Sequence, residues 1–218
     1  FTCLRRLSAK NPRFNYFEAV ILDRNIESNA KQIKLLELSI QHGEESKVDY
    51  NPIDRLVGIY TDIVETHLLT ATEYAASTNE SETDVNRRVE IAKLMVEFLE
   101  FINAPKQFYI ARDLQIYYPL EELLKLTKKC RTDNEVEDLK VSVFNNILMQ
   151  TAGDMTRFIR NIKSIVGTDY QDEFLEEQKE LAANVLDHLP AVGHVNTQVI
   201  REEVRADEEN REALERSM

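Results

Sequence analysis

Tryptophan is absent from this 218-residue chain, and glycine and proline are scarce, with five of each. Glycine and proline interrupt regular structure, so their scarcity beside 30% charged and 43% hydrophobic residues indicates a helix-rich, soluble globular protein. No stretch approaches the ~18 consecutive apolar residues of a membrane span. The composition therefore excludes an integral membrane protein.

Cysteine is also rare, and the two that are present, Cys3 and Cys130, have no second cysteine at metal-ligand spacing. They signal neither a zinc site nor a disulfide framework, so we expect a cytoplasmic protein. Cys130 lies in the basic stretch Lys128–Arg131, a setting that lowers a thiol pKa, but no histidine or acid completes a nucleophilic pair. An incidental cysteine at a helix end is the favoured interpretation.

Catalytic and metal sites are not predicted elsewhere in the chain. The four histidines are scattered, and none has a second ligand type at metal spacing. The acid pairs Glu44–Glu45 and Glu121–Glu122 do not form shared sites, because neighbouring helical residues point about 100° apart. We expect both pairs to be solvated.

The net charge of −12 is unevenly distributed. Residues 167–218 contain 14 acidic and 5 basic side chains, a net of −9, whereas residues 1–166 sum to only −3. A body near neutrality can carry a basic face, but the C-terminal part should repel phosphate backbones.

Hydrophobic periodicity predicts a mainly α fold: a multi-helix bundle with a short α/β remnant at the N-terminus. In that remnant, a strand over 17–23 lies between a helix ending near Lys10 and a helix with Ile33, Leu36 and Ile40 on one face. From Asn51–Pro52 onward only helices are expected. Residues 196–218 have too few apolar positions for a buried helix, and we expect a solvated helix or partial disorder there.

Residues 69–94 have the spacing of a helix-turn-helix. Thr70 or Thr72 is suited to cap a short first helix, Asn79 tolerates the left-handed turn, and Ser81 is suited to cap the second helix. In this motif the second helix enters the major groove by its N-terminal half. Spacing alone also fits a purely structural helical hairpin.

Candidate DNA contacts follow from this register. Arginine pairs with guanine, asparagine with adenine, and serine or threonine with bases or phosphates. The predicted base contacts are Ser81, Thr83, Asn86 and Arg87, and Arg88 and Lys93 are assigned to phosphates or to structure. Phosphate contacts are predicted for a basic helix end and an amphipathic basic helix, with Lys128, Lys129, Arg157 and Arg160. Two acids beside the base contacts, Glu82 and Asp84, oppose phosphate.

The order of these features resembles the ParB family of plasmid, phage and chromosome partition proteins. The matching stretches are FEAVILD (17–23), ELSIQHGEESKVDYNPIDRL (37–56), LLTATEYAASTNESETDV (68–85) and INAPKQFYIARDL (102–114), and the resemblance covers about residues 1–126. It implies residues 1–50 as a remnant of the family's N-terminal domain and 51–166 as the DNA-binding domain, while the change in composition at Gly167 sets off 167–218 as an acidic extension. It also implies double-stranded DNA as a partner, a homodimer, a partition ATPase partner and association with the nucleoid or a plasmid.

The sequence departs from the family pattern at its nucleotide site. Family members bind CTP and Mg²⁺ through a Gly/Arg-rich box that precedes the position of Phe1, and that box is absent here. Leu38 and Ser39 stand where the family has a Glu-Asn pair, and His42 replaces its arginine. The chain lacks an initiator methionine, and we expect it to start inside a longer protein. We therefore expect no cofactor in this chain, with CTP binding and hydrolysis implied only for an intact protein.

Two alternatives remain beside a partition protein. A ParB-like transcription regulator would use the same DNA-binding residues. A helical protein-interaction module that binds no DNA is favoured by the net charge of −12.

Overall fold

The computed structural model of the chain describes residues 6–15, 26–41, 51–191 and 193–217. Every regular element in this part is a helix, which confirms the predicted mainly α bundle. The predicted strand at 17–23, Cys3 and Glu44–Glu45 lie outside the described residues.

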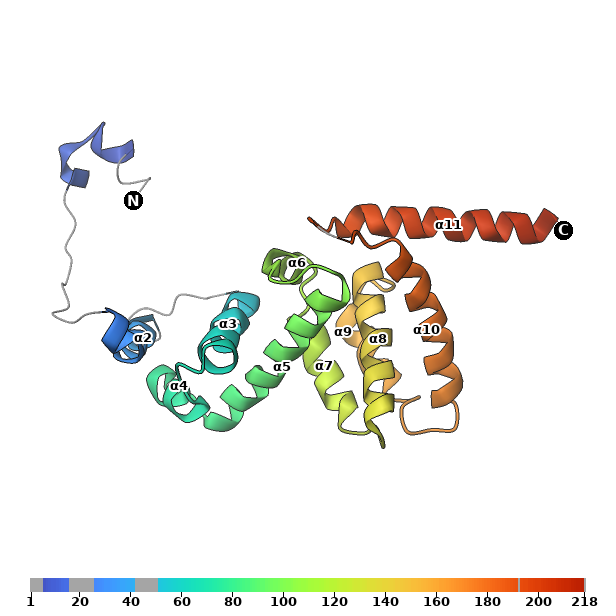
Figure 1. The fold of residues 1–218 in the computed structure, drawn as a ribbon, viewed down its shortest axis with the longest axis horizontal. Helices are drawn as coiled ribbons and strands as arrows, with labels where there is room; N and C mark the ends of the chain where they lie inside the picture. Colours follow the sequence, from blue (N-terminus) through green and yellow to red (C-terminus); the bar gives the residue numbers. More distant parts are fainter. Residues whose placement is uncertain (1–5, 16–25, 42–50, 192, 218) are drawn as a thin grey trace.

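The elements follow the chain in a simple order, and Figure 1 shows most of them packed as a bundle with the last helix across one end. They are η1 (Pro12–Asn15), α2 (Ile26–Gln41), α3 (Pro52–Ile59), the π-helical η2 (Tyr60–Glu65), α4 (Ala71–Thr78), α5 (Glu82–Phe101), α6 (Phe108–Asp113), α7 (Tyr117–Thr127), α8 (Asp133–Met149), α9 (Met155–Ile162), α10 (Gln171–Asp187) and α11 (Thr197–Ser217). As predicted, a helix starts at Asn51–Pro52, with Pro52 in the first turn of α3, where no intrahelical N–H is needed. Asn51 caps this helix by accepting from the Ile53 N–H at 2.9 Å.

The 20-residue helix α5 contributes to both apolar cores of the bundle. Its N-terminal half supplies Val85 and Val89 to a small core formed with α2, α3 and α4. Its C-terminal half supplies fully buried Met95, Phe98 and Leu99 to the large core, which extends to α11. Burial at both ends holds α5 at a fixed position in the bundle.

The helix α2 buries a different face from the predicted one. Leu38 is buried, whereas Leu36 and Ile40 are 43% and 64% exposed. The helix is kinked at Asn29, and two ion pairs orient it. Lys31 pairs with Glu73 of α4 at 2.5 Å, and Lys34 pairs with Asp62 of η2 at 3.3 Å. These contacts with α4 and η2 decide which face of α2 is buried, and the spacing of apolar residues alone does not show them.

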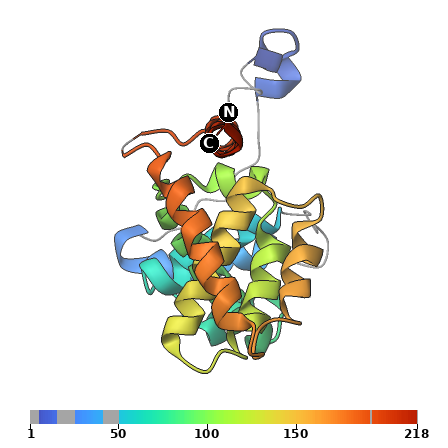
Figure 2. The same cartoon turned by 90° about the vertical axis from the view of Figure 1, so that its right-hand side faces the viewer.

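The expectation that residues 196–218 form a solvated segment is wrong for the first turns of α11. Ile200 and Val204 are 3% and 0% exposed, and they join the large core beside α8 and α10. Beyond Val204 the helix is mainly exposed, and Figures 1 and 2 show it lying across one end of the bundle. The apolar core is therefore continuous across the composition change near residue 167.

Replacement of Ile200 tests this packing. Ile200→Ala should lower the free energy of unfolding by about 2–4 kcal/mol, because it leaves a cavity in the core. The matched variant Val199→Ala, at a 43% exposed position one residue away, should change it by less than about 0.5 kcal/mol. Urea denaturation followed by circular dichroism measures both, and equal small effects would contradict the docking of α11.

Candidate nucleic-acid interface

The helix-turn-helix has the predicted register. Thr70, the first of the two candidate threonines, caps α4 by accepting from the Glu73 N–H at 3.2 Å, and Glu73 Oε2 accepts from the Thr70 N–H at 3.0 Å. The turn contains Asn79 at φ 55°, in the left-handed region that asparagine tolerates. Ser81 then caps α5 by accepting from the Asp84 N–H at 3.1 Å. Local side-chain chemistry thus accounts for both helix starts and the turn.

The carboxylate of Glu80 fixes the turn against the helices around it. Arg88 of α5 donates to both of its oxygens, at 2.8 and 2.7 Å, Arg55 of α3 forms an ion pair with it, and Thr78 donates at 3.1 Å. Burial raises the pKa of Glu80, but the hydrogen bond from Arg88 and the charge of Arg55 outweigh it and hold that pKa below 4.5. Two roles were predicted for Arg88, a phosphate contact and a structural one. Its side chain is only 16% exposed and pairs with Glu80, which fits the structural role.

The predicted base contacts Ser81, Thr83, Asn86 and Arg87 are all exposed. Thr83, Asn86 and Arg87 have i, i+3, i+4 spacing and so share one face of α5, while the buried Val85 faces the core. Lys93 lies ten residues beyond Thr83, about 15 Å along the helix, and pairs with Glu90 at 2.8 Å.

Two acids of α7 connect α5 to α9. Glu121 lies 3.7 Å from Arg87 and 4.0 Å from Lys125, and Glu122 lies 3.1 Å from Lys125 and 3.0 Å from Arg160. Their side chains are only 19% and 12% exposed, so the expectation that this pair is solvated is wrong. Sequence reasoning missed this role. A signal was present, because Lys125 stands four residues after Glu121 and three after Glu122, the spacings of helical ion pairs.

The other predicted phosphate contacts lie near this connection. Lys128 and Lys129 follow the last turn of α7, and Arg157 lies one turn before Arg160 in α9. Lys128, Lys129 and Arg157 are exposed, and no acid among the described residues forms an ion pair with them. In Figure 1 the last turn of α7 and the first turn of α5 lie along the same lower edge, and α11 lies at the upper edge.

The thiol of Cys130 is not activated by its basic neighbours. It is partly buried, and burial together with the charge of Glu135 raises its pKa. Within the described part of the chain, no three His, Cys, Asp or Glu side chains come together as a metal site would require.

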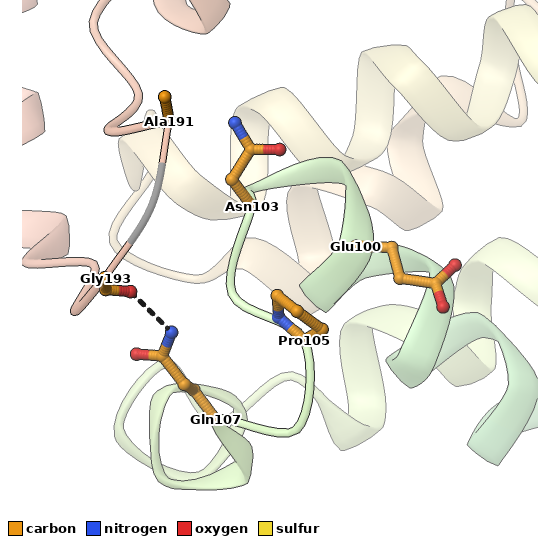
Figure 3. Close-up of a pocket in the computed structure, with 6 residues that line it drawn as sticks. All are labelled: Glu100, Asn103, Pro105, Gln107, Ala191 and Gly193. Carbon is orange, nitrogen blue, oxygen red and sulfur yellow. Dashed lines mark hydrogen bonds between the residues drawn. The ribbon is translucent and has the colours of Figure 1, made fainter.

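A cavity of about 350 Å³ lies at the opposite end of α5 (Figure 3). Its lining includes Glu100, Pro105 and Gln107, and Gln107 donates across it to the Gly193 carbonyl at 3.1 Å. Glu100 is 19 residues from Ser81, about 28 Å along the helix. The cavity is therefore separate from the face of α5 that carries the predicted base contacts.

Compared with protein-family models, with curated proteins and with solved structures, the chain gives no match in any of the three. Its described helices include none that is long and apolar enough to cross a membrane. Functional assignment therefore depends on the geometry of the chain's own residues.

The role of Glu80 predicts a pH-dependent stability. Glu80→Gln should lower the free energy of unfolding by about 1–3 kcal/mol at neutral pH, because Arg55 and Arg88 lose a partly buried partner. The pKa of Glu80 in the folded protein lies below 4.5, its ordinary value. The stability that the Glu80 ion pairs provide is therefore fully present above pH 4.5 and is lost as the pH falls through the pKa of the folded state. The difference between wild type and variant should shrink accordingly, as measured by urea denaturation from about pH 7 to about pH 3.

The control for this prediction is Glu90→Gln, which removes an exposed ion pair from the same helix. It should change the free energy of unfolding by less than about 0.5 kcal/mol at neutral pH. An effect of Glu80→Gln that stays constant through the acid range would contradict the assigned pKa direction.

Proposed function

We propose that this chain is a ParB-like protein that recognises a short site on double-stranded DNA through the N-terminal half of α5. The observation that carries the proposal is the helix-turn-helix itself: α4, a left-handed turn at Asn79 and a helix capped at Ser81. Thr83, Asn86 and Arg87 are exposed on one face of that helix. In DNA-binding helix-turn-helix proteins, residues at these positions of the second helix contact base edges in the major groove, which supports the proposal.

Base recognition in this proposal depends on a prepositioned helix. Arg87 has the two-donor geometry that fits guanine, and Asn86 fits adenine. The Glu80 ion pairs and buried Val85 hold α5 beneath these side chains, so little ordering is needed when DNA binds.

Phosphate contacts would come from Lys128, Lys129 and Arg157, three exposed cations for which no acidic partner occurs among the described residues. Each neutralised phosphate should make the slope of log affinity against log salt more negative by about 0.9. The acidic α11 lies at the other end of the bundle and does not cover this face (Figure 1). The order of motifs over residues 1–126 further supports a homodimer in a partition system.

A binding experiment tests the proposal directly. Labelled DNA fragments from the protein's own replicon are titrated with the chain and followed by fluorescence anisotropy between about 50 and 200 mM salt. Salt-sensitive binding to a few repeated fragments is the expected result, and the genomic position of those fragments separates partition from transcription regulation. Failure to bind any fragment at about 50 mM salt would overturn the proposal in favour of a protein-interaction module.

Removal of one side chain tests the register of the recognition helix. Arg87→Ala should weaken binding to the selected fragment by about 1–3 kcal/mol and relax specificity at one base pair. Arg211→Ala is the matched control, since it removes an ion-paired arginine from α11. Unchanged affinity of Arg87→Ala would show that another part of the chain reads the bases.

A further inference from the structure

The acids Glu121 and Glu122 lie among the cations of the proposed DNA-binding face. Because α7 packs against both α5 and α9, the two carboxylates pair with cations from three helices: Arg87 of α5, Lys125 of α7 and Arg160 of α9. The distances are 3.7, 3.1 and 3.0 Å, with Lys125 also 4.0 Å from Glu121. A connected row of alternating charges therefore crosses the face.

Such pairs compete with DNA for the same cations. A guanidinium or ammonium group that already has a carboxylate partner gains less from a phosphate, and fewer counterions are released from the DNA when it binds. The partial burial of Glu121 and Glu122 reduces the screening of these pairs by salt. The hydrogen bond from Arg160 also lowers the pKa of Glu122, so this carboxylate is charged at neutral pH.

We propose that Glu121 and Glu122 limit the sequence-independent affinity of this face for DNA by holding Lys125 and Arg160 in intramolecular ion pairs, an inference that rests on the proposed function. Glu121 also contributes to holding Arg87, which pairs more closely with Asp84 at 3.2 Å. Lys128, Lys129 and Arg157 stay available for phosphates. Discrimination then depends more heavily on the base contacts of α5.

The test compares the double variant Glu121→Gln/Glu122→Gln with wild type on a fluorescein-labelled random duplex of about 30 base pairs, three helical turns. Affinity at about 50 mM salt should rise about tenfold. The salt slope should become steeper by about 1.8, because Lys125 and Arg160 gain phosphate contacts.

The matched control is Asp207→Asn/Glu212→Gln on α11, which removes two acids that pair with Arg211 and Arg216 at 2.9 and 2.5 Å. This control removes two negative charges, as the Glu121/Glu122 variant does, but at the other end of the bundle. Its affinity for the random duplex should stay within about twofold of wild type. Circular dichroism checks that each variant is folded. If the double variant is not, Glu121→Gln alone leaves the Glu122 pairs intact and should raise affinity about threefold.

The outcomes separate the inference from the function on which it rests. Salt-sensitive binding by wild type with the same affinity and slope in the double variant would overturn the role of the two acids and leave the DNA-binding proposal standing. An equal gain in the α11 control would also overturn it, because net charge would then be the cause. No binding by any of the proteins at about 50 mM salt would overturn both.

Discussion

The two ion pairs of Glu80 are the interaction on which the orientation of α4 and α5, and so the proposed recognition geometry, depends. The eight-residue α4 is too short to be stable alone, so its orientation must come from tertiary contacts. Glu80, in the turn after α4, binds Arg55 of α3 and Arg88 of α5 and thereby joins three helices. Two guanidinium groups compensate for the partial burial of one carboxylate, which a single surface pair would not do.

The length of α5 gives that geometry its rigidity. Its C-terminal half is fixed in the large core by Phe98 and Leu99, and its N-terminal half packs through Val85 on the small core. A helix held at both ends presents Asn86 and Arg87 in one position relative to the bundle. The same helix separates the cavity near Glu100 from the proposed recognition face, so its two ends have different surroundings.

Features set by local chemistry could be predicted from the sequence, and features set by distant partners could not. Asn79 and Ser81 determine the turn and the helix start through their own backbones and neighbours, so their roles were predictable. The buried face of α2, the docking of Ile200 and the ion pair of Arg87 with Glu121 depend on residues far away in the chain. The positions of the candidate site were therefore accessible from sequence, but the charges facing them were not.

The distribution of acids decides how an acidic protein could present the proposed DNA-binding face. At physiological ionic strength charges act over about 8 Å, so the acids of α11 contribute little to contacts made at the other end of the bundle. At low ionic strength, where the screening length grows to about 30 Å at 0.01 M, these acids oppose the approach of DNA and slow the encounter. Glu121, in contrast, lies 3.7 Å from Arg87 and acts on it at contact distance. On the proposed function, low affinity for random DNA is thus consistent with tight binding to a site whose base edges replace Asp84 and Glu121 as the partners of Arg87.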